Sequence, residues 1–419
     1  MITERAAPAA ADTATPPAPG PGGGAPRVTL RVGQTPGEGD LAGGDHRVLQ
    51  AAVDYVAAAG GGTVRIGPGT YLMGDSLHLR PGVTVRGSGP ETVLRKAPSA
   101  ESALVLDGDY GEEQITVADG RGFAPGAGVA VWDDRSGGFH TVVGTLLEGP
   151  IPPRVPEEEP GSTFRVSRPM QADYLVSRNA RAATVFPVIS GYHLSGARIE
   201  QLTIDGNRGE NAPLNGCRGG GIFLYRAHGT AIADCVVRDY NGDGISFQQS
   251  DDVRVLRCRV SGNAALGIHP GSGSQRPVVA DCHSFGNGTI GLFLCWRVRG
   301  GRFERNRLEG NGRVGISIGH KDTDNLFVEN VVTGNAGYGV LFRDEAAPMS
   351  GHRNRFLRCT IEGNGRDDPQ GAEVRVDGGT RGVVFETCVV GAAPAVVEAG
   401  QTPPGVVVGP RAEAPTFIP

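Results

Sequence analysis

The sequence lacks an excess of basic residues, and this absence argues against one large class of partner. Among its 419 residues, Lys and Arg number 40 and Asp and Glu number 45, which gives a formal net charge of −5. A nucleic-acid-binding protein would carry a basic face, so we expect no nucleic-acid partner. The chain also has no apolar run near the roughly 18 residues of a membrane-spanning helix, and we expect no membrane partner.

The usual marks of a secreted protein are also missing. Residues 1–26 are rich in Ala, Pro and Gly, without the basic start and apolar centre of a signal peptide, and we expect a disordered leader. Three of the seven Cys (Cys235, Cys258 and Cys282) recur at a fixed spacing, which favours buried reduced thiols over disulfides. These features favour a cytoplasmic protein, and export by a route that the sequence does not show stays open.

What the chain does contain is glycine, 67 residues of it, and the glycines reveal a repeat. A glycine followed by an apolar residue recurs at steps of 23, 23, 24, 24 and 24 residues. A fixed period of this length is typical of a solenoid. The six copies are Gly221-Ile222, Gly244-Ile245, Gly267-Ile268, Gly291-Leu292, Gly315-Ile316 and Gly339-Val340.

The columns within the repeat predict which solenoid forms. Residues one and three positions after each glycine are mostly apolar, whereas those two and four positions after it are mixed, which is typical of a strand with one buried face. Two further columns precede the glycine by nine and twelve residues, so each repeat holds at least two strands and leaves no room for a helix. The sequence therefore predicts an all-β parallel β-helix whose coils stack about 4.8 Å apart.

The chain before and between the repeats predicts the domain organisation. Residues 45–59 form one helix with an apolar face of Val48, Ala52, Val53 and Val56, stopped by three glycines and placed to cover the first coil. We expect a leader (1–26), an N-terminal cap with the first coils (27–110), an inserted β-rich segment (111–190), the main coils (191–399) and a tail (400–419).

The run LQAAVDYVAAAGGGTVRIGPGTYLMGDSLHLRPGVTVRGSG, within Asp45 to Leu94, resembles the entry segment of the pectate-lyase-like superfamily. With the repeats, the resemblance covers about residues 45–390 and implies a right-handed parallel β-helix. The superfamily includes pectate lyases, polygalacturonases, alginate epimerases and phage tailspikes, so the resemblance does not fix the reaction. Trimers occur in it, and a homotrimer is one oligomer that it allows.

The outer face of stacked strands forms a shallow groove that suits an extended polymer, and polar residues that break the repeat are the candidates for chemistry there. An asparagine column is not among them, because a ladder of amides satisfies the turn backbone: Asn263, Asn287, Asn311 and Asn335. His269 is expected to point outward as an acid or base, and Trp296 to stack on a sugar. A surface histidine and a tryptophan that folds back are the structural alternatives.

Two turns supply the strongest candidate cluster. The first contains His320, Lys321 and Asp322, and the second contains Arg343, Asp344 and Glu345 one coil further on. A solvated charged turn is the alternative, but a cation, an imidazole and a carboxylate together are the ingredients of proton transfer. Glycines in the outward column beside Trp296, Gly271 and Gly319, are expected to leave hollows.

The leading hypothesis is a carbohydrate-active enzyme that removes the proton next to a uronate carboxylate, as a lyase or an epimerase. Arg343 and Lys321 would bind the carboxylate, His320 or His269 would act as base or acid, and Asp322 would orient a histidine. Residues expected to line the sugar are Tyr225, Gln248, Trp296 and Asp344, with Glu345 completing the catalytic set.

Two other functions stay open. Asp322, Asp344 and Glu345 could supply the paired carboxylates of a glycoside hydrolase, although the polygalacturonase histidine position is occupied here by Val314. A tailspike-like or glycan-binding protein without catalysis is the third. No resident cofactor is expected; Asp243, Asp251 and Asp252 could hold calcium, but such turns are common without metal.

Overall fold

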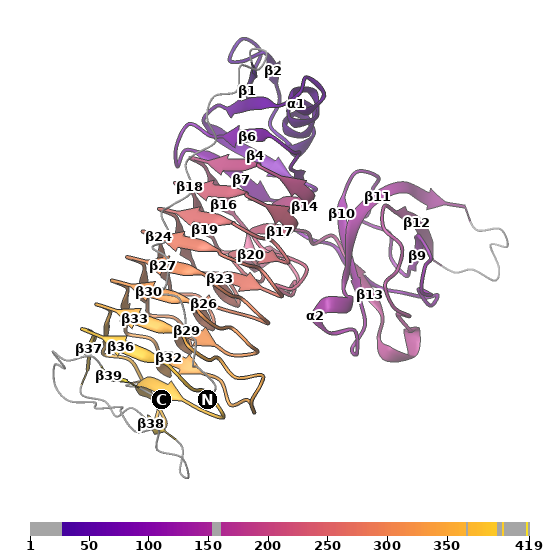
Figure 1. The fold of residues 1–419 in the computed structure, drawn as a ribbon. Helices are drawn as coiled ribbons and strands as arrows, with labels where there is room; N and C mark the ends of the chain where they lie inside the picture. The colour runs from indigo at the N-terminus through magenta and orange to yellow at the C-terminus, as the bar shows by residue number, and fades with distance from the viewer. Residues whose placement is uncertain (1–26, 153–160, 366–367, 392–395, 398–415, 418–419) are drawn as a thin grey trace, which may run out of the picture.

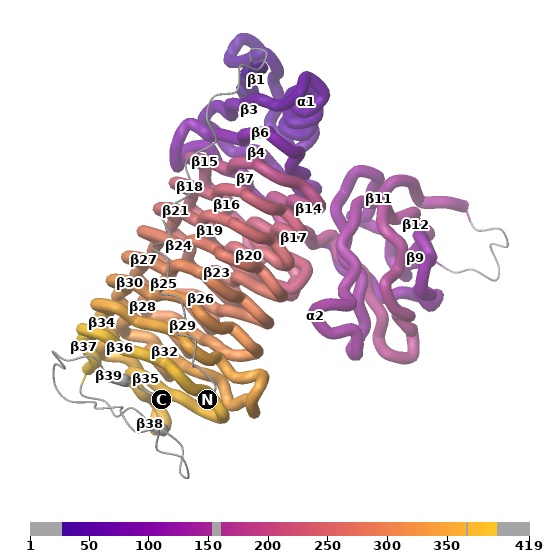
Figure 2. Tube along the Cα trace, viewed as in Figure 1, coloured from indigo at the N-terminus to yellow at the C-terminus, as the bar shows by residue number. Residues whose placement is uncertain are grey.

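The computed structural model describes residues 27–152, 161–365, 368–391, 396–397 and 416–417, and strands dominate it (Figure 1). The expected leader (1–26) and most of the expected tail (400–419) lie outside the described residues. The predicted right-handed parallel β-helix is confirmed. Successive coils stack into a long column, and a smaller body stands beside its N-terminal half (Figures 1 and 2).

Three long sheets form the column, because each coil adds one short strand to each of them. Sheet A contains β2 (Leu41–Ala42), β1 (Val28–Gly33), β3 (Gly62–Ile66), β6 (Val83–Arg86), β15 (Arg198–Glu200), β18 (Ala231–Ala233), β21 (Arg254–Leu256), β24 (Val278–Ala280), β27 (Arg302–Glu304), β30 (Leu326–Val328), β33 (Arg355–Leu357), β36 (Val384–Glu386) and β39 (Thr416–Phe417). Sheet B contains β4 (Gly69–Met73), β7 (Thr92–Lys96), β16 (Thr203–Asp205), β19 (Val236–Arg238), β22 (Arg259–Ser261), β25 (His283–Phe285), β28 (Arg307–Glu309), β31 (Val331–Thr333), β34 (Thr360–Glu362) and β37 (Val389–Val390). Sheet C contains β5 (Leu77–His78), β14 (Ile189–Ser195), β17 (Ile222–His228), β20 (Ile245–Gln248), β23 (Leu266–Gly271), β26 (Ile290–Phe293), β29 (Val314–Ile318), β32 (Tyr338–Phe342), β35 (Ala372–Val376) and β38 (Val396–Val397).

The register places like residues above like, as the repeat predicts. Ile222 pairs with Ile245, and Ile245 with Ile268, all of them buried. In sheet A, Phe303 and Phe327 stack in parallel with ring centroids 4.8 Å apart, and the stack continues through the next coils. The core is therefore a set of vertical columns, which gain aromatic stacking in addition to burial.

Polar ladders close the same coils. The side-chain amide of Asn263 donates to Asn287 at 2.9 Å, and the same bond repeats from Asn287 to Asn311 and from Asn311 to Asn335. Each amide also accepts from the backbone N–H of the asparagine in the preceding coil, so these buried groups are satisfied. Cys235, Cys258 and Cys282 are buried free thiols, as expected.

The one long helix among the described residues is α1 (His46–Ala58), close to the predicted bounds. The Asp45 side chain accepts a hydrogen bond from the Arg47 N–H, and Leu49, Ala52, Val53 and Val56 are buried. Val48 of the predicted face is only half-buried. The helix lies at the N-terminal end of the coils (Figure 1), and its role as a cover for them stays a prediction. Neither helix in the described part of the chain has the length and apolarity to cross a membrane.

The smaller body is an antiparallel sheet with a core of its own. That core contains Ile115, Val131 and Phe164. The chain leaves the coils after β7 and rejoins them at β14, so the body is inserted between early coils; the boundaries proposed above, 111–190, remain a prediction about domain division. Its elements are β8 (Glu101–Ala103), β9 (Gln114–Val117), β10 (Gly128–Trp132), α2 (Gly137–His140), β11 (Val142–Ile151), β12 (Ser162–Val166), the 3-10 helix η1 (Val176–Arg178) and β13 (Arg181–Ala183). A second 3-10 helix, η2 (Arg208–Glu210), follows β16 in the coils.

Candidate functional site

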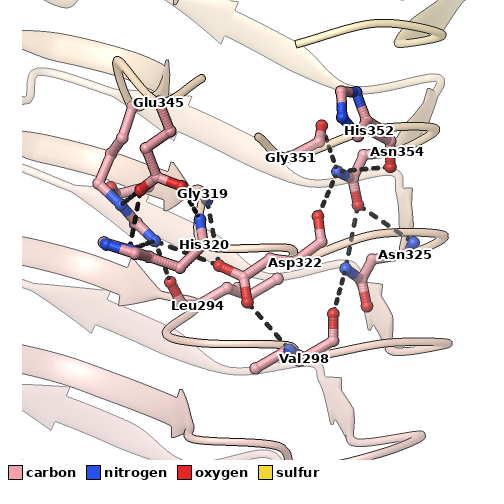
Figure 3. Close-up of polar contacts among 12 residues, drawn as sticks. Leu294, Val298, Gly319, His320, Asp322, Asn325, Glu345, Gly351, His352 and Asn354 are labelled. Atoms are coloured by element: carbon pink, nitrogen blue, oxygen red, sulfur yellow. Dashed lines mark hydrogen bonds and ion pairs between the residues drawn. The ribbon is translucent and has the colours of Figure 1, made fainter. Parts of the chain in front are cut away.

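The two predicted turns do come together, at the ends of β29 and β32 (Figure 3). The ring of His320 stacks on Trp296 of the preceding coil, with centroids 4.6 Å apart and planes 10° apart. Glu345 holds this histidine from the other side, with its Oε1 2.8 Å from Nδ1 and its Oε2 accepting the His320 backbone N–H. Trp296 remains 36% exposed, so a flat aromatic surface faces solvent here.

Arg343 is not free to bind a substrate carboxylate as predicted, because its guanidinium is already engaged. It donates to the Ser317 hydroxyl and to the Leu294 carbonyl, both at 2.9 Å, and lies 3.2 Å from Asp322 Oδ2. The guanidinium also covers the Phe293 ring, 4.7 Å from its centroid, and the side chain is 17% exposed. These contacts describe a structural cation that joins three coils.

Asp322 is fully buried and fastens the turn. One oxygen accepts the Val298 N–H at 2.9 Å, and the other accepts the Gly319 N–H at 3.0 Å (Figure 3). Burial raises the pKa of Asp322 to about 7, against the opposing effect of Arg343. The prediction that Asp322 orients a histidine is wrong; Glu345 contacts His320 instead. Burial lowers the pKa of His320, which favours the neutral imidazole.

The other residues of these turns contribute less. Lys321 is half-buried and Asp344 is exposed. Behind the turn, the Asn325 amide donates to Asn354 Oδ1 at 3.0 Å in a further ladder (Figure 3). Because Asp322 is buried, it cannot serve as one of two accessible carboxylates for hydrolysis.

The hollows expected beside Trp296 do not exist. A Cβ on Gly319 would lie 2.7 Å from Arg343 Nε and 2.8 Å from Glu345 Oε1, and a Cβ on Gly271 would collide with the Gln248 side chain. The space beside each of these glycines is thus filled by a long side chain from an adjacent coil. This does confirm the predicted stacking of Gly319 and Arg343 in adjacent coils.

His269 does not line an exposed groove, and this expectation is wrong. Its ring is buried, with Nδ1 2.7 Å from Asp243 Oδ2 and Nε2 3.5 Å from the buried amide of Gln248. The reason is the long connection between β16 and β17, which covers the outer face of sheet C. The Ser246 hydroxyl donates to the Gly216 carbonyl of this connection at 2.7 Å.

An open cleft lies elsewhere, between the inserted sheet and the first coils of sheet C. Its volume is about 310 Å³. Of the predicted sugar-binding residues, Tyr225 lines it. Its lining residues are Thr141, Val143, Arg168 and Gln171 from the insertion, and Tyr192, His193, Arg218, Tyr225 and Arg226 from the coils.

The cleft is cationic and aromatic, since its lining has three arginines and no Asp or Glu. The Arg168 guanidinium lies over the Tyr192 ring, 3.9 Å from its centroid. The Arg218 Nε is buried and has no hydrogen-bond partner in the described part of the chain, a state that it shares with Arg178, Arg181 and Arg343. Burial raises the pKa of Tyr192, which keeps its phenol protonated.

Sequence reasoning missed most of this cleft. Arg168 and Gln171 come from the inserted segment, whose irregular sequence has no repeat from which to place them. A signal did exist in the early coils: Tyr192 pairs directly with Tyr225 in the register and continues the same outward column by one coil.

Among the described residues, no group of three or more His, Cys, Asp and Glu side chains is placed to hold a metal ion. Two of the aspartates considered for calcium, Asp251 and Asp252, face Arg276, which lies 3.7 Å and 2.8 Å from them. Asp243 faces His269.

Comparisons with known proteins agree with the fold. A family model described as a right handed beta helix region matches residues 189–361. No curated protein matches the chain by sequence. The polygalacturonase from Erwinia carotovora superimposes with a TM-score of 0.53 at 13% identity, over 85% of this chain and 86% of that one.

Two further solved structures are similar at lower scores. ORF18 of Geobacillus virus E2 has a TM-score of 0.49 at 13% identity, over 85% of this chain, which spans 55% of that protein. The A-module of the mannuronan C-5 epimerase AlgE4 from Azotobacter vinelandii has a TM-score of 0.44 at 15% identity, over 85% of this chain and 96% of the module. At such identities the likeness concerns the fold alone.

Proposed function

Since this chain has the right-handed parallel β-helix fold of the pectate-lyase-like superfamily, we propose that it is an enzyme that acts on an acidic glycan in the cleft beside β14 and β17. The reaction is removal of the proton next to a uronate carboxylate, by a lyase or an epimerase. The observation that carries the proposal is the lining of the cleft, with three arginines and no carboxylate.

Each cleft residue has a role in this chemistry. Arg168, Arg218 and Arg226 bind the uronate carboxylate and stabilise the negative charge that develops when the neighbouring proton leaves. The Tyr192 phenol, held protonated, donates a proton, and the exposed His193 accepts one. In a lyase the donated proton goes to the departing glycosidic oxygen; in an epimerase it adds, from the opposite face, to the carbon that lost its proton to His193.

Paired carboxylates for glycoside hydrolysis have less support. The lining of the cleft contains none, and Asp322, the buried member of the set considered above, already accepts two backbone N–H groups. An aromatic side chain at the cleft suits a sugar ring, and Tyr225 lies beside Tyr192 with ring centroids 6.3 Å apart.

The test is a product assay on a panel of polyuronates and neutral glycans. A lyase product has an unsaturated sugar that absorbs in the ultraviolet, and an epimerase product has unchanged mass with altered stereochemistry by NMR. Either result, restricted to acidic glycans and lost in Arg218→Ala, supports the proposal. A product that has gained water indicates a hydrolase, and binding without any product indicates a glycan-binding protein; both outcomes would overturn it.

A further inference from the structure

The cleft beside β14 and β17 is short along the axis of the coils. Tyr192 and Tyr225 line it from sheet C, and they are register partners in adjacent strands, about 4.8 Å apart. The next residues of the same outward column are all buried: Gln248, Gly271 and Cys295. The cleft volume of about 310 Å³ lies at the lower end of the roughly 300–1,000 Å³ that is typical of ligand sites. The cleft therefore covers two strands of sheet C and has room for a short ligand.

The long connection between β16 and β17 closes the cleft on its C-terminal side. Gly216 of this connection lies directly against the next coil, since a Cβ on Gly216 would collide with the Asp243 carboxylate. The Gly216 carbonyl accepts the Ser246 hydroxyl, and the same connection contributes Arg218 to the lining of the cleft. A chain that continued from the cleft towards the later coils of sheet C would collide with this segment.

The N-terminal side of the cleft is closed by contacts of the inserted sheet, which stands beside this part of the column (Figure 1). Thr145 of β11 donates a hydrogen bond to Asp75 Oδ2 at 2.6 Å, across the boundary between the insertion and the coils. Asp75 Oδ2 lies 3.3 Å from His78 Nε2, and His78 Nδ1 lies 2.9 Å from the Ser190 hydroxyl of β14. This series of contacts joins one wall of the cleft to its floor, and Asp75 and Ser190 within it are buried.

A second contact holds the inserted sheet on the other side of the cleft. Gly138 of α2 packs so closely against the connection that a Cβ on Gly138 would collide with the Asn215 side chain. Thr141 and Val143, which line the cleft, lie between Gly138 and Thr145 in the sequence. This wall of the cleft is therefore attached to the coils at both of its ends.

The cleft opens towards the ends of β14 and β17. His193 and Arg226 line it there, and both are exposed. Nearer the start of the same strands, Ser190 and Phe223 form a second pair of register partners, which are only 2% and 0% exposed. A ligand therefore enters past His193 and Arg226 and meets buried side chains on the far side.

We infer that this cleft, closed on three sides, admits the end of an acidic glycan and excludes the middle of a chain, so that the protein acts on terminal uronate residues. The inference rests on the proposed function and adds the position of the reacting residue within the substrate. A polymer that is bound in mid-chain leaves its site in two directions and needs two open sides. The arginines of the lining then bind the carboxylate of the terminal residue.

The test uses one polyuronate in four forms: with both ends free, coupled to a bead through its reducing end, blocked by a bulky group at its non-reducing end, and blocked at both ends. Wild-type protein is expected to act on the free form, to keep its activity on one of the singly blocked forms, and to lose it on the other and on the doubly blocked form. The earliest products locate the reaction. A lyase releases a single small product, seen by mass spectrometry, and an epimerase changes the terminal residue, seen by NMR.

A variant in the wall tests the cause of this selectivity. Thr145→Val removes the hydrogen bond to Asp75, whereas Thr145→Ser keeps the hydroxyl. For Thr145→Val, the ratio of kcat/KM on the doubly blocked chain to kcat/KM on the free chain is expected to rise about fivefold, as the loss of one hydrogen bond in the wall predicts. Thr163→Val is the matched control, because Thr163 bonds to Thr116 within the same inserted sheet, at 2.9 Å. Thr145→Ser and Thr163→Val are expected to keep the wild-type ratio.

The outcomes separate the two proposals. If wild-type protein acts equally on the free and the doubly blocked chains, the inference about chain ends is wrong and the proposed function stands. If Thr145→Val and Thr163→Val give the same ratio, the wall does not exclude the middle of a chain, and the inference is again wrong. If wild-type protein changes no acidic glycan, even with both ends free, the proposed function fails and the inference fails with it.

Discussion

The cleft and the His320–Arg343 cluster lie along the same edge of sheet C, yet they use arginine in opposite ways. In the cluster, Arg343 donates to a hydroxyl, a carbonyl and a buried carboxylate. In the cleft, the described partners of Arg218 are the Cys217 carbonyl and two aromatic rings. The Nε of Arg343 is buried without a hydrogen-bond partner, as is that of Arg218, so the two arginines differ in their terminal nitrogens. Those of Arg343 contact several groups of the fold, whereas the described hydrogen bond of Arg218 goes to the Cys217 carbonyl.

Replacing Arg343 is expected to have the largest effect on the free energy of unfolding. Arg343→Ala leaves Asp322 buried without its cation, and loss of one partner of a buried pair costs about 3–5 kcal/mol. We expect the free energy of unfolding, measured with urea, to fall by that amount. An unfolding free energy within about 0.5 kcal/mol of the wild type would show that Arg343 is not a structural cation.

Replacing Arg218 is expected to lower activity strongly and stability only slightly. Arg218→Ala is expected to lower kcat/KM on an acidic glycan about 100-fold, which corresponds to about 2.7 kcal/mol of transition-state stabilisation. Its free energy of unfolding is expected to fall by only about 1 kcal/mol, because one hydrogen bond and two ring contacts at 5.8 and 5.9 Å are lost. Arg218→Lys recovers only part of the activity, since an ammonium cannot bind a carboxylate bidentately. Equal activity of Arg218→Ala and the wild type would contradict the role of the cleft.

The third prediction concerns pH. Asp322 has a pKa of about 7 in the folded protein, above its ordinary value, so between about pH 4 and pH 7 the folded state holds a proton that the unfolded state has released. Stability from this group is therefore present at low pH and is lost as the pH rises towards 7. Relative to Asp322→Asn, wild-type protein should lose roughly 1–2 kcal/mol between pH 5 and pH 7. Parallel pH profiles of the two proteins would refute the assignment to Asp322.

The smallest effect on stability is expected at the exposed turn that precedes β24. Arg276→Ala removes an exposed ion pair with Asp252, and such pairs contribute about 0.2–1 kcal/mol. We expect a small fall in unfolding free energy that disappears at high salt, with activity retained. A loss of unfolding free energy comparable to that of Arg343→Ala would mean that this exposed ion pair and the buried cluster do not differ as described.

The sequence predicted the coils well because their signal is repeated. Six copies of one glycine-apolar pair set the register of sheet C, and the asparagine column predicted a ladder that the structure contains. A wrong interpretation of one residue would have been corrected by the equivalent residues in the other coils. The helix at residues 45–59 was found for a similar reason, because its four-residue periodicity is strong on its own.

The candidate site could not be predicted in the same way, because its residues depart from the repeat. The alternation along a strand indicates which face a side chain takes, and it does not indicate what covers that face. His269 lies on the outer side but is buried under the connection that contains Gly216. The cleft depends on an insertion whose packing against the coils follows from no pattern in the sequence, and Arg168 could be placed only once that packing was known.

The asparagine ladder runs in one direction along the coils, and a carboxylate lies at its C-terminal end. From Asn263 to Asn335, each side-chain amide donates to the asparagine of the next coil towards the C-terminus, and Asn364 donates to the carboxylate of Glu373 at 2.7 Å. A chain of aligned dipoles with an anionic terminus can be lengthened or shortened only by whole windings, each bringing its own amide. Duplication or deletion of one winding would then leave the terminus intact and alter the reach of the protein along its long axis by a single step.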